Sequence, residues 1–117
     1  MADKIKIYQK PTCTKCRETI GILKERGVEF DSVNYYEAPL TAAELRDLVE
    51  KLGISPRDLL RKGEKVYREL KLAQRELTDD ELIVLMIENP DLIQRPIVVR
   101  GKKAVLGRPP ESVEDLF

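Results

Sequence analysis

Residues 5–17 read IKIYQKPTCTKCR and contain both cysteines of the 117-residue chain, Cys13 and Cys16. The alternating apolar residues before them predict a buried strand, and the apolar spacing after them predicts a helix over about 14–26. Gly27 follows that helix, at a position where a left-handed glycine commonly ends one. The two thiols are therefore expected where a first strand leads into a first helix, with Cys13 at or just before the helix N-terminus.

This position favours a reactive thiolate at Cys13, because the free backbone N–H groups and the positive end of the helix dipole stabilise negative charge. Arg17, one turn further along the helix, is placed to reach back toward the sulfur, and Lys10 and Lys15 add positive potential. Cys16 is expected to be less exposed and less favoured by the dipole. We therefore interpret Cys13 as the nucleophile and Cys16 as a thiol that attacks a Cys13 adduct and closes a disulfide.

The residue inventory limits the other chemistry that the cysteines can support. The chain contains two cysteines and no histidine. A structural zinc site needs four such ligands, so we expect no bound metal. Activation of Cys13 must come from fixed positive charge and helix N–H groups, because no imidazole can act as its base.

The charges of the chain balance, with 21 Lys and Arg residues against 21 Asp and Glu residues. A net charge of zero argues against a general nucleic-acid or membrane binder. The basic residues nevertheless gather in two windows without acidic residues, 4–17 and 92–110, which raises the expectation of an anion site. The chain has no long apolar run, and we expect it in the cytoplasm, where a cysteine pair is typically catalytic rather than a structural disulfide.

Local patterns predict the remaining elements. Two capping-box sequences, TAAE at 41–44 and TDDE at 78–81, predict helix starts. The expected elements are a strand over 28–34, helices beginning after Thr41, Ser55 and Thr78, a short helical turn over 66–72, strands over 97–99 and 104–106, and a last short helix over 113–117 capped by Ser112.

The order β-α-β, helical stretch, β-β-α is typical of the α/β thioredoxin-like fold, with helices packed on a four-stranded mixed sheet. The β-α-β start implies two parallel neighbours, and the short turn between the last two strands predicts an antiparallel hairpin. We expect a single domain over 1–117 with a helical insertion at about 41–90.

Three arginines are candidate ligands for an oxyanion. Arg95 precedes Pro96 at the start of the third expected strand, where thioredoxin-like folds place a cis-proline facing the cysteine. Arg108 follows the fourth strand, and Arg61 ends a short helix in the insertion. Guanidinium groups that converge on a helix N-terminus would bind a tetrahedral oxyanion by paired hydrogen bonds. Each arginine alone would be an ordinary surface charge, so this site depends on their convergence.

These motifs resemble the arsenate reductase (ArsC) family of thioredoxin-fold proteins over residues 5 to about 116. The resemblance implies that Cys13 attacks arsenate, that Arg17 helps to lower the thiol pKa, and that Pro96 is the cis-proline. It also implies that Arg61, Arg95 and Arg108 bind the oxyanion. The residues that carry the resemblance are Lys10–Cys13 with Arg17, Leu59–Arg61, Asn89–Pro90 leading to Arg95–Val98, and Gly107–Pro109.

The chain departs from the family pattern at two places. Gln9 stands where family members often carry a histidine before the cysteine, and glutaredoxin-coupled members have one cysteine in this motif instead of two. The C-x-x-C spacing resembles Spx, a redox-sensing transcription regulator that binds RNA polymerase. The segment Gly107-Arg108-Pro109, which keeps the third arginine, instead favours an enzyme.

The leading hypothesis is an arsenate reductase-like thiol oxidoreductase that acts on arsenate or a related oxyanion. It would have no bound cofactor, and glutathione with glutaredoxin, or thioredoxin, would supply electrons. We expect a monomer that does not bind nucleic acid or membrane. The alternatives are an Spx-like partner of RNA polymerase and a glutaredoxin-like disulfide reductase without an oxyanion role.

Overall fold

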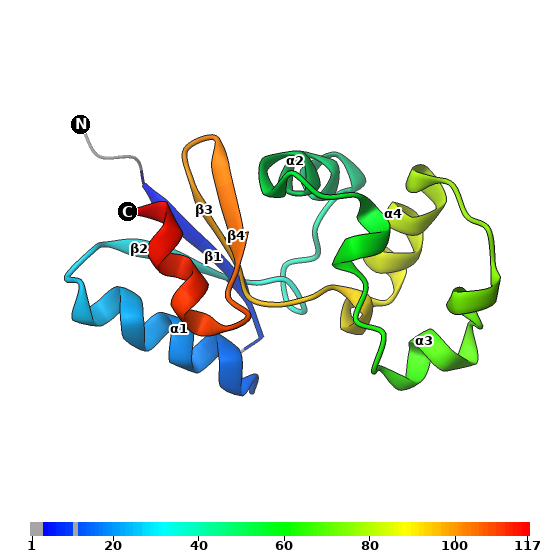
Figure 1. The fold of residues 1–117 in the computed structure, drawn as a ribbon, viewed down its shortest axis with the longest axis horizontal. Coiled ribbons are helices and arrows are strands. Elements are labelled where there is room, and N and C mark those ends of the chain that lie inside the picture. The colour runs from blue at the N-terminus through cyan, green and yellow to red at the C-terminus, as the bar shows by residue number, and fades with distance from the viewer. Residues whose placement is uncertain (1–3, 11) are drawn as a thin grey trace. The chain divides into compact units, whose positions relative to one another are not determined.

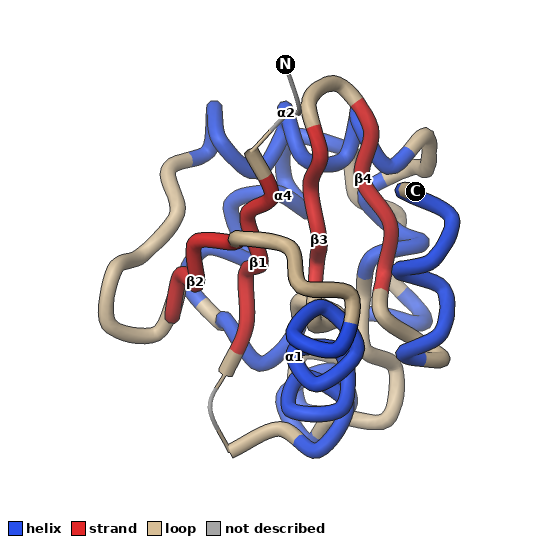
Figure 2. The backbone as a smooth tube through the Cα atoms, turned by 90° about the vertical axis from the view of Figure 1, so that its left-hand side faces the viewer, coloured by secondary structure: helices blue, strands red, loops and turns tan. Residues whose placement is uncertain are grey.

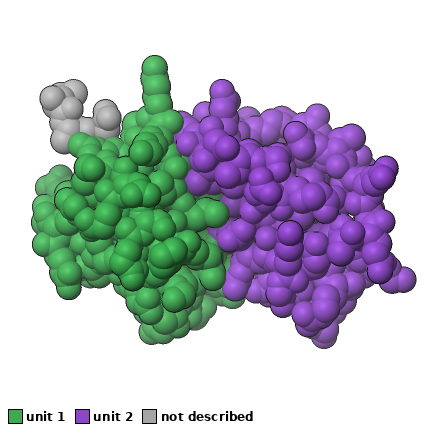
Figure 3. Space-filling view, in the orientation of Figure 1, with its two compact units in different colours: residues 1–39, 95–117 green, residues 40–94 purple. Residues whose placement is uncertain are grey.

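The computed structural model describes residues 4–10 and 12–117, so Pro11 of the cysteine motif lies outside the described residues. The chain divides into two compact units, shown in different colours in Figure 3. Met1–Pro39 and Arg95–Phe117 form the sheet unit, and Leu40–Gln94 form the helical unit. The expectation of one domain with an insertion at about 41–90 stays a prediction.

The sheet unit contains four strands in the order β2-β1-β3-β4 (Figure 2). Strand β1 pairs in parallel with β2 and antiparallel with β3, and β3 pairs antiparallel with β4. The mixed sheet and the C-terminal hairpin are therefore confirmed. The strands are β1 (Ile5–Gln9), β2 (Phe30–Asn34), β3 (Ile97–Arg100) and β4 (Lys103–Leu106).

One face of this sheet is covered by α1 (Thr14–Glu25) and by the 3-10 helix η4 (Pro110–Leu116), which lie side by side (Figure 1). Because side chains alternate along a strand, the residues of β1 and β3 that face these helices fall at every second position. Burial of these apolar side chains is the main favourable contribution to the stability of this unit. The buried residues of this core cluster are Ile5, Ile7, Leu23, Val98, Val113 and Leu116.

The last helical element differs from the expectation in one detail. Helix η4 begins at Pro110, so Ser112 lies inside it and does not cap its start. Proline fits the first helical position well, because its backbone lacks an N–H and its φ is already fixed near the helical value. The two consecutive prolines at 109–110 therefore set the start of the helix earlier than the serine would.

Three helices of the helical unit begin at the expected caps, Thr41, Ser55 and Thr78. The single turn expected over 66–72 is wrong, because the left-handed backbone of Lys71 separates two short elements, Lys65–Glu69 and Leu72–Gln74. Thr41 Oγ1 accepts from the Glu44 N–H (3.1 Å) while Glu44 accepts from the Thr41 N–H (3.2 Å), so the capping box is formed. Thr78 and Glu81 form the same reciprocal pair. No helix in the described part of the chain is long and apolar enough to cross a membrane. The helices are α2 (Ala42–Leu52), α3 (Lys65–Glu69), α4 (Asp79–Glu88) and the 3-10 helices Pro56–Leu59, Leu72–Gln74 and Pro90–Leu92.

Gly107, directly after β4, occupies a position with no room for a side chain. A Cβ atom there would lie 2.6 Å from Thr19 Oγ1 and 2.7 Å from Pro96 Cγ. We expect Gly107→Ala to lower the free energy of unfolding by about 1–3 kcal/mol, measured by urea denaturation, because the proline ring cannot yield without moving backbone.

Gly21 provides the matched control for this substitution. It lies inside α1, and an added Cβ would meet nothing within 4 Å. Gly21→Ala is expected to stabilise the protein by about 0.5–1 kcal/mol, because alanine loses less backbone entropy in a helix. Equal effects of the two substitutions would contradict the close packing at Gly107.

Candidate active site

One end of the sheet brings together segments that are far apart in the sequence. Strand β1 ends at Gln9, and the chain then turns toward Cys13. Strand β3 is antiparallel to β1, with Tyr8 opposite Ile97, and β4 is antiparallel to β3. The residues that precede β3 and follow β4 therefore lie at the same end of the sheet as the cysteine motif. They are Arg95, Pro96, Gly107 and Arg108.

Cys13 is the N-cap residue of α1, as the sequence predicts. Its backbone is extended, with φ −83° and ψ 123°, and its carbonyl accepts the first helical hydrogen bond from the Arg17 N–H (3.1 Å). The Cys13 N–H donates to the Lys10 carbonyl (2.9 Å), which closes the turn before the helix. The half-buried Cys13 thiol thus lies at the positive end of the helix dipole.

Opposing effects act on the thiol of Cys13, and the stabilising ones prevail. Burial raises the pKa of this thiol, while hydrogen bonds from the Cys16 thiol and the Cys16 backbone N–H lower it. The positive charges of Arg95 and Arg108 lower it further, so that the pKa of Cys13 lies below its ordinary value. The described sheet unit therefore favours the thiolate form of Cys13 more than an ordinary exposed thiol would.

Cys16 has the opposite character. Its side chain is fully buried, and burial, a hydrogen bond with Cys13 and the negative charge of the Cys13 thiolate raise the pKa of Cys16 to about 12. Hydrogen bonding to the backbone of Lys10 opposes this rise, as does the charge of Arg95. Both thiols are reduced in the structure. The lower exposure expected for Cys16 is confirmed.

Arg95 is almost entirely buried, with 7% of its surface exposed. The Arg95–Pro96 peptide bond is cis, as the resemblance implies. Arg95 Nη1 donates to Tyr36 Oη at 3.4 Å, and its buried Nε has no hydrogen-bond acceptor among residues 4–10 and 12–117. Burial lowers the pKa of Arg95, but Tyr35 and then Tyr36 raise it, so two adjacent tyrosines act on this guanidinium group.

Arg108 is hydrogen-bonded to the segment that contains Arg95 and Pro96. Its Nε donates to the Arg95 carbonyl (2.8 Å), and the neighbouring Gly107 N–H donates to the Pro96 carbonyl (2.9 Å). These bonds bring the two arginines of the sheet unit together beside Cys13, on which both charges act. Arg17 is exposed on α1, and its expected effect on the thiol stays a prediction.

Arg61 belongs to the helical unit. Its N–H donates to the Leu92 carbonyl (2.7 Å), and its Nη1 forms an ion pair with Glu64 Oε1 (3.0 Å). Its participation in the oxyanion site stays a prediction. Gln9 donates from Nε2 to Ser32 Oγ (2.7 Å), so its amide is used within the sheet.

Two features of this end of the sheet escape sequence reasoning. The Arg108–Pro109 peptide bond is also cis, which no local pattern distinguishes from a trans bond. Tyr36, two residues after β2, contacts Arg95. The signal for Tyr36 lies in the topology, because parallel pairing of β1 and β2 brings the ends of both strands to one edge.

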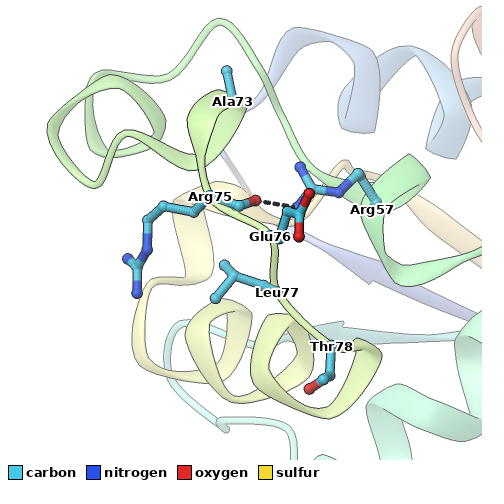
Figure 4. A pocket seen from close by; sticks show the side chains of 6 residues that line it. All are labelled: Arg57, Ala73, Arg75, Glu76, Leu77 and Thr78. Carbon is cyan, nitrogen blue, oxygen red and sulfur yellow. Dashed lines mark hydrogen bonds between the residues drawn. The ribbon is translucent and has the colours of Figure 1, made fainter.

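A separate open hollow of about 660 Å³ lies on the helical unit. The guanidinium group of Arg57 donates there to the carbonyls of Arg75 (3.0 Å, the dashed line in Figure 4) and Leu72 (3.3 Å). Arg57 therefore holds the loop before α4 and is not aimed at a ligand. In the part of the chain that the structure describes, no group of three or more His, Cys, Asp or Glu residues could hold a metal ion.

The two thiols should differ sharply in their reaction with iodoacetamide as pH changes. Only the thiolate reacts with iodoacetamide. The labelling rate of Cys13 should therefore rise with pH along a single titration curve, whose midpoint lies below the ordinary thiol value of about 8.5. Cys16 should remain unlabelled up to about pH 10, because its thiol stays protonated and buried. Mass spectrometry of the peptides distinguishes the two sites.

Denatured protein serves as the control for this labelling. In concentrated urea both cysteines should react alike, and the labelling of each should have its pH midpoint at about 8.5. Equal labelling of the two cysteines in the folded protein would contradict the different environments of the thiols.

A sequence model of the ArsC family matches residues 8–116 of the chain. The chain is 50% identical over 117 residues to the uncharacterized protein YfgD of Escherichia coli K12, covering 99% of this chain and 98% of the relative. It is 43% identical over 113 residues to an arsenate reductase of Escherichia coli, covering 97% of this chain and 80% of the relative.

The fold has a close counterpart among solved structures. The arsenate reductase from Vibrio cholerae superposes with a TM-score of 0.94 at 39% sequence identity, and the match covers 100% of both chains. The thioredoxin-like fold predicted from the element order is thereby confirmed.

Proposed function

Because the chain belongs to the ArsC family, we propose that it is a thiol oxidoreductase that reduces arsenate or a related oxyanion through Cys13. The single observation that carries the proposal is the meeting of three groups at one end of the sheet. A half-buried thiol of lowered pKa lies at a helix N-terminus, beside the positive charges of Arg95 and Arg108. Such a site attracts an anion and holds a nucleophile ready for it.

In the first step the Cys13 thiolate attacks the arsenic atom of arsenate. A sulfur–arsenic bond forms, an arsenic–oxygen bond breaks, and the oxygen leaves as hydroxide or, once protonated, as water. Arg95 and Arg108 stabilise the charge of the oxyanion and of the adduct, and we assign the same role to Arg61 from its matching position in the family motif. Arsenic remains in its pentavalent state in this adduct.

In the second step the Cys16 sulfur attacks Cys13 Sγ. The sulfur–arsenic bond breaks, its electron pair stays on arsenic, and trivalent arsenite leaves with the proton of the Cys16 thiol while the two cysteines become a disulfide. Burial, the largest cause of the raised pKa of Cys16, remains in the adduct, but the negative charge on the Cys13 sulfur and its hydrogen bond from Cys16 are lost. Cys16 therefore becomes more reactive at the stage where it is needed.

The disulfide must then be reduced by an external thiol donor of the thioredoxin or glutathione–glutaredoxin type. We assign the protein to the cytoplasm, where such donors keep thiols reduced. A small oxyanion and this donor are the partners that the reaction requires.

A single-turnover experiment tests this function without assuming a donor. Reduced protein is mixed anaerobically with excess arsenate, and arsenite and protein disulfide are measured. We expect up to one arsenite and one Cys13–Cys16 disulfide per chain. Protein with fully reduced Cys13 that yields neither product would overturn the proposal. A disulfide formed with oxidised glutathione but never with arsenate would instead support a disulfide reductase.

A further inference from the structure

We propose that Tyr36 is a positioning residue that holds the guanidinium group of Arg95 beside Cys13, where this group stabilises the bound oxyanion. This inference rests on the proposed function and adds to it a residue that contacts neither arsenic nor sulfur. It concerns only the sheet unit, in which all three residues lie.

The backbone brings Tyr36 to the active end of the sheet. Strand β2 runs parallel to β1, so the residues after Asn34 emerge at the same edge as the residues that lead to Cys13. The Asn34 side chain accepts from the Tyr36 N–H (3.0 Å), and the Asn34 carbonyl accepts from the N–H groups of Glu37 (3.1 Å) and Ala38 (2.9 Å). This turn fixes the direction in which the Tyr36 side chain leaves the strand.

The Tyr36 side chain contacts Arg95 in two ways. Its hydroxyl accepts from Arg95 Nη1 (3.4 Å), and its ring centroid lies 5.9 Å from Arg95 Cζ. The donors of a guanidinium group share one rigid plane, so a bond that fixes Nη1 also fixes the direction of Nε–H. That Nε is buried and has no acceptor in the described chain, on a side chain of which 7% is exposed. Tyr35 acts on the same guanidinium group, so the two adjacent tyrosines together restrict its orientation.

The Tyr36 ring also contacts a second cation and a buried aromatic ring. Lys10 Nζ lies 4.6 Å from the Tyr36 ring centroid, within the range of a cation–π contact. The Tyr35 ring, 2% exposed, lies 5.0 Å from that of Tyr36. Tyr36 thereby links the turn after β2, the loop before Cys13 and the segment before β3, and these three segments build the site.

The test compares Tyr36→Phe, which removes only the hydroxyl, with Tyr36→Leu, which removes the ring as well. Both are made in the natural chain and in an Arg95→Ala background. The readouts are the rate of Cys13 alkylation against pH and the arsenate concentration that halves this rate. For Tyr36→Phe we expect that concentration to rise about three- to tenfold, the effect of losing one hydrogen bond. In the Arg95→Ala background the same change should have no further effect.

Tyr8→Phe is the matched control, since Tyr8 lies in β1 with Lys6 Nζ 5.7 Å from its ring and is not part of the site. It should leave both readouts unchanged. Unaltered protection in Tyr36→Phe, or an equal loss with and without Arg95, would overturn the inference, because a merely structural tyrosine does not act through Arg95. If arsenate does not protect natural Cys13 at all, the proposed function fails. The inference is then decided by Tyr36→Leu, which must still shift the alkylation profile to higher pH by displacing the Arg95 charge.

Discussion

Cys13→Ser is expected to abolish arsenate reduction, lowering its rate at least about a thousandfold. Cys16→Ser should stop the reaction after the Cys13–arsenic adduct has formed. Without Cys13 no sulfur–arsenic bond can form, so neither adduct nor arsenite should be detected. Without Cys16 the adduct should still form, but no protein disulfide can release arsenite. Mass spectrometry of the intact chain and an arsenite assay distinguish the two outcomes.

The serine at position 16 is a close control for the first step. A hydroxyl can replace the Cys16 thiol as a donor to the Cys13 sulfur, and the backbone N–H of residue 16 is retained, so the pKa of Cys13 should stay low. Alkylation of Cys13 should therefore proceed as in the natural chain. Arsenite release by Cys16→Ser in the absence of any external thiol would contradict the role of Cys16, and release by Cys13→Ser would contradict the proposed nucleophile.

The fold could be predicted because its signals are local. The capping box at Thr41 and Glu44 depends on residues within one turn, and it forms as the sequence indicates. The alternation around Ile5 and Ile7 marks a strand whose apolar side chains do enter the core. Where two local signals compete, the prediction fails, as at Ser112, since the prolines before it start η4 earlier.

The active site could be predicted only in part, because its chemistry depends on contacts between distant segments. The position of Cys13 at a helix start follows from its neighbours in sequence. Its pKa follows only in part: the hydrogen bonds from Cys16 that lower it are local, but the charges of Arg95 and Arg108 come from more than eighty residues away and are brought there by the sheet register. The role of Tyr36 cannot be predicted for the same reason, since its contact with Arg95 joins the turn after β2 to the segment before β3.

Arg95 thus acts on both reactants, and pH can separate its two effects. Its charge lowers the pKa of Cys13, and the proposed function also assigns it to the bound oxyanion. Arg95→Ala should lower kcat/KM for arsenate by about 10- to 100-fold at pH 7, since a hydrogen bond to a charged group contributes about 1.5–3 kcal/mol. Raising the pH above the pKa of Cys13 in the variant should restore the thiolate. This should recover the part of the loss that comes from the raised pKa of Cys13, but not the part that comes from weaker binding of the oxyanion.

Arg95→Lys separates the effects by chemistry instead of pH. Lysine keeps the positive charge, so the alkylation profile of Cys13 should stay near that of the natural chain, but it lacks the planar set of donors that an oxyanion needs. The KM for arsenate should therefore rise while thiol reactivity is retained. Arg46→Ala, which removes an exposed arginine paired with Asp80, is the control and should change neither quantity. If high pH restored the full activity of Arg95→Ala, Arg95 would serve the thiol alone, and the oxyanion would have to be held by the remaining arginines.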